Sequence, residues 1–277
     1  MPNHQLQFIE ELISLHEKEK SEQENLLKRK RSSYPAFLDE LHTIYRCEKE
    51  RLYNGYMKPF MDEYSFLCKK SSLDILKRIQ DENFHSRFLK EIWEEIPAAM
   101  FDFFKLAGIT DEWLGTIHDC HYDITVEYHT RSSRKKDLCN KRVDLLIEDP
   151  VNHWVIAIEN KIFSHVHSDS QSGRDQLEIY ADYCRRKFPA YERKHILLSR
   201  CDNETYALKN NWVYVDYYTV MKSLLKYGKE SGVVRDYLQT LYSLLFDGEQ
   251  FDTHSYHEET SLCQYYSFIN SIISKIY

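Results

Sequence analysis

Glycine and proline are scarce in this sequence, with 7 and 6 residues among 277. Low counts of both argue against a loop-rich or disordered protein and favour long helices. The seven cysteines are odd in number, widely scattered and never spaced C-x-x-C, so neither a disulfide framework nor a zinc cluster is expected. Unpaired thiols are typical of a reducing compartment, and we therefore predict a cytoplasmic protein.

Long apolar stretches are absent as well. No run approaches the roughly 18 residues that a membrane-spanning helix requires, so no membrane partner is predicted. The first residues lack the basic segment followed by an apolar one that marks a secretory signal. No G-x-x-x-x-G-K-[ST] motif occurs, so an ATP-driven step would require another protein. A net charge of −7 is not the overall signature of a nucleic-acid coat protein, although it allows a local basic surface.

Helical patterns fill the first eighty residues. Apolar residues recur there at spacings of three and four, at Leu6, Ile9, Leu12 and Ile13. The charged run Glu17–Arg31 is typical of a solvated helix face. Further helices are predicted over Tyr34–Tyr53, ended by Asn54-Gly55, and over Phe60–Gln80. We therefore expect residues 1–80 to form a helical N-terminal extension.

The remaining chain, residues 81–277, alternates between strand and helix patterns. Strands are predicted over His121–Thr130, Arg142–Glu148, His153–Ile162, His195–Ser199 and Trp212–Val215. Helices are predicted over Asp81–Ile96, Ala98–Ala107, a segment that begins at Gln176, Tyr218–Tyr227, Val233–Phe246 and Glu258–Tyr277. This order indicates one α/β domain, in which helices flank a small mixed β-sheet and further helices follow at the C-terminus.

Two neighbouring predicted strands carry charged residues. Along His153–Ile162, alternation places Glu159 and Lys161 on one face. An antiparallel hairpin that turns near Val151 places Asp144 nearly opposite Glu159. Two carboxylates and an ammonium group then share a small patch on otherwise apolar strands. Because nearby carboxylates repel one another and unpaired buried charge is costly, a divalent cation is the common remedy, and oxygen ligands suit Mg²⁺ or Mn²⁺.

A simpler interpretation of these charges must be weighed. An E-x-K tripeptide is common by chance and often forms a solvent-facing pair, and Asp144 could be a charge on an edge strand. The surroundings favour a site instead. The tripeptide lies in an apolar strand, a hydrophobic R-V-D-L-L-I strand precedes it at hairpin distance, and a helix begins near Gln176 after it.

This arrangement resembles the PD-(D/E)XK nuclease superfamily, in which the signature Asp lies on one strand and the E-x-K on the next. The pattern here is Asp144 followed by Glu159-Asn160-Lys161. Val143 precedes the Asp, where the motif's name has proline. The helix that follows carries Gln176 and Tyr180, which resemble the Q-x-x-x-Y motif of RecB-like nucleases.

A second segment resembles one bacterial branch of the superfamily, which carries an E-x-x-H-S motif. Glu82, His85 and Ser86 match it here, at the start of a predicted helix. In that branch the Glu faces the metal site. Glu82 is equally well explained as an acidic residue in a first helical turn, and His85 is more typical of packing.

The resemblance implies a restriction-endonuclease-like fold and a Mg²⁺- or Mn²⁺-dependent hydrolase that cleaves phosphodiester bonds. The metal ligands would be Asp144, Glu159, the backbone carbonyl of Asn160, and Glu82. Lys161 would orient or deprotonate the attacking water, or stabilise charge on the phosphate. The catalytic set would also include Gln176, near the water or Lys161, and Tyr180, which would place substrate or support the site.

Nucleic acid is the partner that the resemblance implies, with DNA favoured over RNA. The candidate phosphate contacts are Arg131, Arg134, Lys135, Lys136, Lys141 and Arg142. A solvated hairpin loop explains the same residues equally well. Two other functions stay open, namely a non-catalytic binding or structural module with this fold and a hydrolase of nucleotides or tRNA. A homodimer or a partner protein is also left open.

Overall fold

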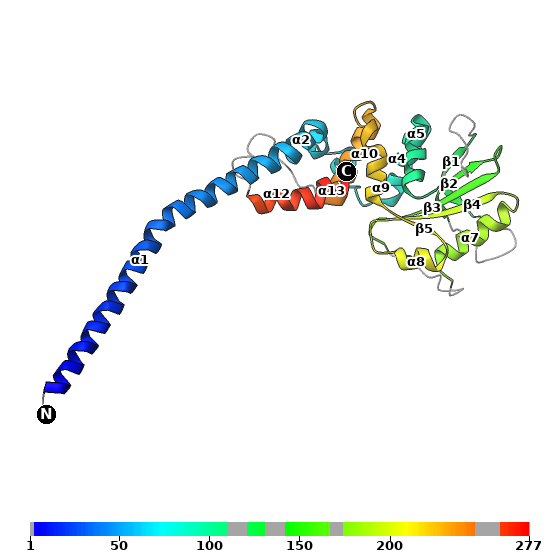
Figure 1. The fold of residues 1–277 in the computed structure, drawn as a ribbon. Helices are drawn as coiled ribbons and strands as arrows, with labels where there is room; N and C mark the ends of the chain where they lie inside the picture. The colour runs from blue at the N-terminus through cyan, green and yellow to red at the C-terminus, as the bar shows by residue number, and fades with distance from the viewer. Residues whose placement is uncertain are drawn as a thin grey trace. The chain divides into compact units, whose positions relative to one another are not determined.

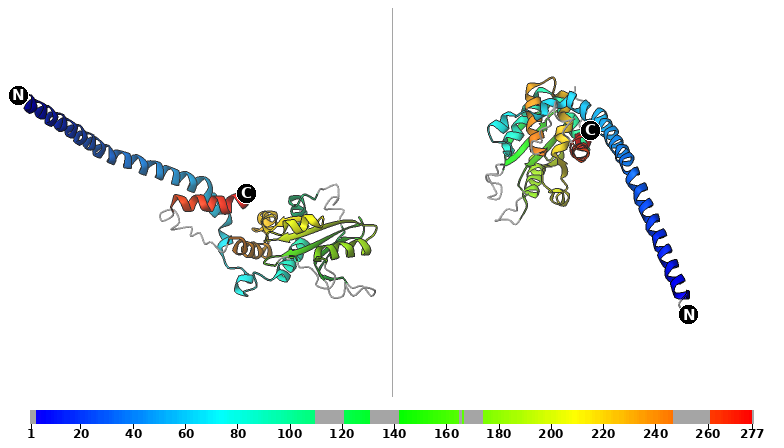
Figure 2. Two further views of the ribbon diagram at one scale, coloured as in Figure 1. Left: turned by 90° about the horizontal axis from the view of Figure 1, so that it is seen from below. Right: turned by 90° about the vertical axis from the view of Figure 1, so that its left-hand side faces the viewer.

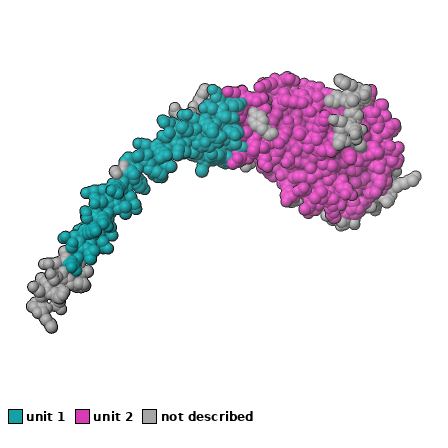
Figure 3. Space-filling model, viewed as in Figure 1, with its two compact units in different colours: residues 1–59, 257–269 teal, residues 60–256, 270–277 magenta. Residues whose placement is uncertain are grey.

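The computed structural model describes residues 3–109, 121–130, 142–164, 166, 174–246 and 261–276 (Figure 1). The chain divides into two compact units, which Figure 3 colours separately. The first comprises Met1–Pro59 and His257–Ile269, and the second comprises Phe60–Tyr256 and Asn270–Tyr277. The domain boundary expected near residue 80 remains a prediction. Within the described ranges, no helix combines the length and the apolarity that crossing a bilayer requires.

One long helix dominates the first unit. α1 (Asn3–Leu52) continues through Pro35, and a π-helical turn, Tyr53–Met57, follows it. The predicted start of a new helix at Tyr34 is therefore wrong, whereas α1 ends at Leu52, directly beside the end predicted at Tyr53. Proline removes only one backbone hydrogen bond, and the strong helix formers on both sides maintain the helix around it.

The C-terminal part of α1 has a packing partner within this unit. The hydroxyl of Tyr266, on α12 (Leu262–Phe268), donates a hydrogen bond to the carboxylate of Glu48. The charged run Glu17–Arg31 has no such cover, because all of its side chains are exposed. This exposure confirms the solvated face that the charge pattern predicts.

Residues 58–76 form short helices instead of the single helix predicted over Phe60–Gln80. These are α2 (Lys58–Tyr64), a 3-10 turn (Ser65–Cys68) and α3 (Ser72–Ile75). Ser71 and Asp74 form a reciprocal capping box that begins α3. Lys77 then adopts a left-handed backbone (φ 56°), which ends the helix.

A five-stranded mixed sheet forms the centre of the second unit, in the order β1-β2-β3-β4-β5. Its strands are β1 (Asp123–His129), β2 (Arg142–Asp149), β3 (Trp154–Lys161), β4 (Glu192–Ser199) and β5 (Val213–Asp216). β1, β2 and β3 pair antiparallel, and β4 and β5 extend the sheet in parallel. The hairpin predicted between the second and third strands is therefore confirmed.

Helices cover both faces of this sheet (Figures 1 and 2). One face carries the group α4 (Glu82–Glu95), α5 (Pro97–Leu106), α9 (Tyr217–Leu224) and α10 (Gly232–Phe246). The other face carries α7 (Gln176–Lys187), and α8 (Glu204–Lys209) connects β4 to β5. A π-helical turn (Ile269–Ile273) and α13 (Ser274–Ile276) end the described chain. This architecture confirms the predicted α/β fold class.

Burial along β3 explains where its charged end lies. All eight residues of β3 are buried. Val155 and Ala157 pack with Leu177 and Tyr180 of α7 in one apolar cluster. Since side chains alternate along a strand, Glu159 and Lys161 extend this α7-facing row beyond the apolar cluster.

Candidate active site

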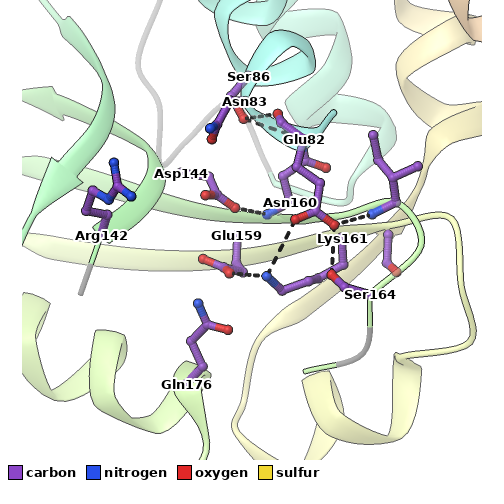
Figure 4. A network of polar contacts seen from close by, with 12 residues as sticks. Glu82, Asn83, Ser86, Arg142, Asp144, Glu159, Asn160, Lys161, Ser164 and Gln176 are labelled. Atoms are coloured by element: carbon purple, nitrogen blue, oxygen red, sulfur yellow. Dashed lines mark hydrogen bonds and ion pairs between the residues drawn. The ribbon is translucent and has the colours of Figure 1, made fainter. Parts of the chain in front are cut away.

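Asp144 and Glu159 lie at neighbouring positions on β2 and β3. The pairing of these strands ends with Leu145 opposite Ile158, so the next position outward brings Asp144 opposite Glu159. The Asp144 side chain replaces the ladder bond there, because its Oδ2 accepts a hydrogen bond of 2.8 Å from the backbone N–H of Asn160. Figure 4 shows both carboxyl groups beside the end of β3. The predicted juxtaposition thus has a direct structural cause in the hairpin.

Lys161 neutralises one side of a buried carboxylate. Glu159 is 0% exposed and Lys161 is 6% exposed. The Nζ of Lys161 lies 2.7 Å from Oε1 of Glu159 (Figure 4). The second oxygen, Oε2, is buried and accepts no hydrogen bond from the described residues. Because an unsatisfied buried oxygen is costly, this atom is a candidate ligand for a cation.

The two carboxyl groups resist ionisation when no cation is present. Burial raises the pKa of Asp144 to about 6, although the charge of Lys161 and the Asn160 amide partly offset it. Burial and then the charge of Asp144 raise the pKa of Glu159 well above its usual range. Burial alone would lower the pKa of Lys161, but the adjacent Glu159 outweighs it and the pKa is raised. A cation between the carboxylates would relieve their mutual repulsion.

Glu82 reaches the site from the first turn of α4. Asp81 caps this helix by accepting a hydrogen bond from the Asn83 amide. The Glu82 Oε1 accepts hydrogen bonds from the Ile162 amide, at 2.9 Å, and from the Ser164 hydroxyl, at 2.8 Å. Its Oε2 lies 3.9 Å from the Nζ of Lys161. Glu82 therefore connects α4 both to Lys161 and to the segment that follows β3.

The side chain of Asn160 points to the opposite face and fixes α4 on the sheet. Its Nδ2 donates to the backbone carbonyl of Glu82, at 3.1 Å, and to the Ser86 hydroxyl, at 3.3 Å. Its Oδ1 accepts a hydrogen bond from the Tyr217 hydroxyl. His85 is buried, and its Nε2 lies 2.8 Å from the Ile79 carbonyl, so this ring nitrogen is paired with the backbone.

Gln176 and Tyr180 are connected by hydrogen bonds to the backbone at the start of β2. The Gln176 amide donates to the Tyr180 hydroxyl at 2.8 Å, and that hydroxyl donates to the backbone carbonyl of Arg142. Burial, and then the charge of Glu159, raise the pKa of Tyr180, so it stays a neutral donor. The pair therefore fixes the backbone two residues before Asp144.

Glu127 of β1 is a neighbour of the site that sequence reasoning missed. The pairing of β1 with β2 places it opposite Asp144, and its charge contributes to the raised pKa of Asp144. It adopts a left-handed backbone (φ 51°), which is rare for a non-glycine residue in a strand. Its carboxylate lies 2.6 Å from Arg142 and 3.6 Å from Arg87. No spacing in the sequence signals these contacts.

The other predicted basic contacts, Arg131, Arg134, Lys135, Lys136 and Lys141, lie outside the described residues. Among the residues that are described, no three His, Cys, Asp or Glu side chains form a ready-made metal cluster. The predicted ligands Asp144, Glu159 and Glu82 therefore do not form a preformed cage in the described part of the chain.

The mixed sheet, the helices on both of its faces and the helical N-terminal region define a restriction-endonuclease-like α/β fold. The family model of the PD-(D/E)XK nuclease superfamily matches residues 46–239, which is more than half of the chain. The protein therefore belongs to the PD-(D/E)XK nuclease superfamily. Searches of curated proteins and of solved structures give no match.

Proposed function

We propose that this protein is a metal-dependent nuclease that hydrolyses phosphodiester bonds, with DNA favoured over RNA. The main support for the proposal is the carboxylate of Glu159, which lies beside Asp144. Its Oε2 is buried and has no hydrogen-bond donor among the described residues. Membership of the nuclease superfamily supports hydrolysis as the reaction. The acidic pair and the adjacent Lys161 together supply a ligand set and a fixed positive charge.

Mg²⁺ or Mn²⁺ fits the donor atoms at this position. Asp144 and Glu159 offer carboxylate oxygens, which these hard cations prefer. The backbone amide of Asn160 points toward Asp144. Because the amide and the carbonyl of a strand residue face the same neighbouring strand, the Asn160 carbonyl also points toward Asp144 and is proposed as a third metal ligand. When bound, such a cation polarises the phosphate and lowers the pKa of water.

Glu82 has a different role in this proposal from the ligand role that the resemblance implies. Its Oε1 already accepts two hydrogen bonds, and its Oε2 faces Lys161. We assign Glu82 to positioning Lys161 and the segment Ile162–Ser164. Contact with the metal would require Glu82 to give up these partners.

Lys161 supplies a fixed positive charge and does not act as a base. Its raised pKa keeps the ammonium protonated at neutral pH. The ammonium can then stabilise negative charge that develops on the phosphate, or orient the attacking water. Gln176 and Tyr180 support Asp144 through the backbone of Arg142.

Arg142 is the candidate phosphate contact that the structure describes. Its side chain is half exposed and lies 2.6 Å from Glu127, so part of its charge is already neutralised. The remaining basic residues of the preceding segment are proposed to contact phosphates as well. These contacts would position substrate without reading its sequence.

Incubation of the purified full chain with labelled oligonucleotides tests the proposal. Single-stranded DNA, duplex DNA, circular DNA and RNA are each incubated with Mg²⁺, with Mn²⁺ and with chelator. We expect metal-dependent cleavage by the wild type, a loss of about 10²–10³ in rate for Lys161→Gln, and full activity for the exposed control Lys222→Ala. Binding without cleavage of any substrate would favour the non-catalytic module.

A further inference from the structure

Phe163 is an exposed aromatic residue directly beside the candidate active site. It follows Lys161 by two positions, and 47% of its surface is exposed. The guanidinium of Arg200 lies 4.8 Å from the centre of its ring. The backbone amide of Arg200 donates a 3.0 Å hydrogen bond to the Lys161 carbonyl. Both partners are therefore attached to the end of β3, where the catalytic lysine lies.

A hollow of about 400 Å³ adjoins this ring. Its lining consists of Gln80, Asp81, Glu82, Asn83, Phe163 and Ser164. Glu82 belongs both to the hollow and to the site, because its Oε2 lies 3.9 Å from the Nζ of Lys161. The hydrogen bonds from Ile162 and Ser164 to Glu82 fix one wall of the hollow against the other. The hollow therefore begins where the candidate active site ends.

The chemistry of this lining favours a nucleobase over a phosphate. Carboxylates at Asp81 and Glu82 repel an anion, and the Asp81 carboxylate can also accept a hydrogen bond from the amino group of a base. Asn83 adds an exposed amide that can both donate and accept. An aromatic face with an adjacent guanidinium is the surface on which unstacked bases bind. The volume also falls within the range of small-ligand sites, roughly 300–1,000 Å³.

We propose that the hollow binds an unpaired nucleobase of the nucleotide next to the scissile phosphate, stacked on Phe163. The inference rests on the proposed nuclease function and extends it to a substrate class. In an intact duplex both base faces are stacked and the base would have to flip out to enter. Single-stranded or flapped nucleic acid presents such a base without that cost, so it is the preferred substrate.

Binding measurements test the hollow independently of cleavage. Full-length protein carrying Asp144→Asn, which cannot cleave under the proposed mechanism, is titrated with single-stranded oligonucleotides that contain one 2-aminopurine. We expect stacking to quench its fluorescence at one position. Phe163→Ala should lose this quenching and weaken binding by about 10- to 100-fold. Phe163→Trp should restore both, and the exposed control Tyr206→Ala should change neither.

Replacing the quenched nucleotide with an abasic one completes the test. If the base stacks on Phe163, the loss of affinity caused by the abasic nucleotide and the loss caused by Phe163→Ala should not be additive. Unchanged binding and quenching in Phe163→Ala, or fully additive losses, would overturn the proposal. In the wild-type background, Phe163→Ala should also lower the ratio of single-stranded to duplex cleavage. A wild type that shows the quenching but cleaves nothing would refute the nuclease function alone, whereas cleavage with an unchanged ratio in Phe163→Ala would refute the base site alone.

Discussion

Replacing Lys161 with methionine would remove an ammonium group and keep most of the side chain's length. Glu159, which is fully buried and 2.7 Å from this ammonium, would then lose its ion-pair partner. Breaking a buried pair by removing one member costs about 3–5 kcal/mol of unfolding free energy. Because the pKa of Glu159 is already raised, proton uptake relieves part of the loss. We therefore expect a cost of about 3 kcal/mol at pH 8, the low end of that range.

The matched double variant separates charge from packing. Glu159→Gln/Lys161→Met has no charge in the pair, so most of the penalty should disappear, with a coupling energy of about 1.5–3 kcal/mol. For a unit of this size, the single variant should melt roughly 6–12 °C below the wild type. Thermal and urea unfolding in metal-free buffer measure both quantities.

The pH dependence gives a second check on the same variant. A carboxyl group whose folded pKa is raised stabilises the protein at low pH and loses that contribution as the pH rises through the folded pKa. The deficit of Lys161→Met should therefore be smaller at pH 5.5 than at pH 8. Equal melting temperatures for wild type and variant at pH 8, with additive effects in the double variant, would show that the pair is screened by solvent and would refute the reasoning.

Three further predictions concern single groups. Asp144→Asn should stabilise the metal-free protein by about 1–3 kcal/mol at pH 7, since the raised pKa of Asp144 shows that burial disfavours its anion. It should also abolish the proposed cleavage and the rise in melting temperature that we expect Mn²⁺ to give the wild type; an unstabilised or Mn²⁺-responsive variant contradicts this. Tyr180→Phe should lower the stability by about 1 kcal/mol and slow cleavage, because the Arg142 carbonyl loses a donor; unchanged single-turnover rates would disprove the support role. Burial lowers the pKa of His195 to about 4. The unfolding free energy of the wild type should therefore fall by about 1–2 kcal/mol between pH 8 and pH 5, whereas His195→Phe should not show this fall. Parallel pH–stability curves for the two proteins would contradict this prediction.

The sheet could be predicted from the sequence because its patterns are local. The alternation of side chains along His153–Ile162 and a hairpin that turns near Val151 together predict that Asp144 lies nearly opposite Glu159, and the strand pairing agrees. The helix predicted to start at Asp81 likewise agrees with α4, whose N-cap is Asp81. Each of these signals depends on residues that are close in the sequence, so no tertiary information is required.

Contacts between distant segments could not be predicted in this way. The hydrogen bonds from Ile162 and Ser164 to Glu82 join residues about eighty positions apart. Glu127 lies beside the site because β1 pairs with β2. Its left-handed backbone conformation could not be predicted from the sequence. The course of α1 through Pro35 shows the converse, in which good helix formers on both sides override a local helix breaker.

The buried end of β3 explains why a destabilising site can persist in this fold. Apolar residues such as Val155, Ala157 and Ile158 are fully covered, and their burial stabilises the strand that also carries Glu159. A purely structural ion pair at this position would be expected to satisfy both carboxylate oxygens, because each unsatisfied one costs free energy. Here Lys161 contacts Oε1 while Oε2 remains without a donor among the described residues. Such incomplete satisfaction beside a second carboxylate fits the proposed cation site. Variants that neutralise Asp144 or Glu159 should therefore gain stability while they lose the proposed activity.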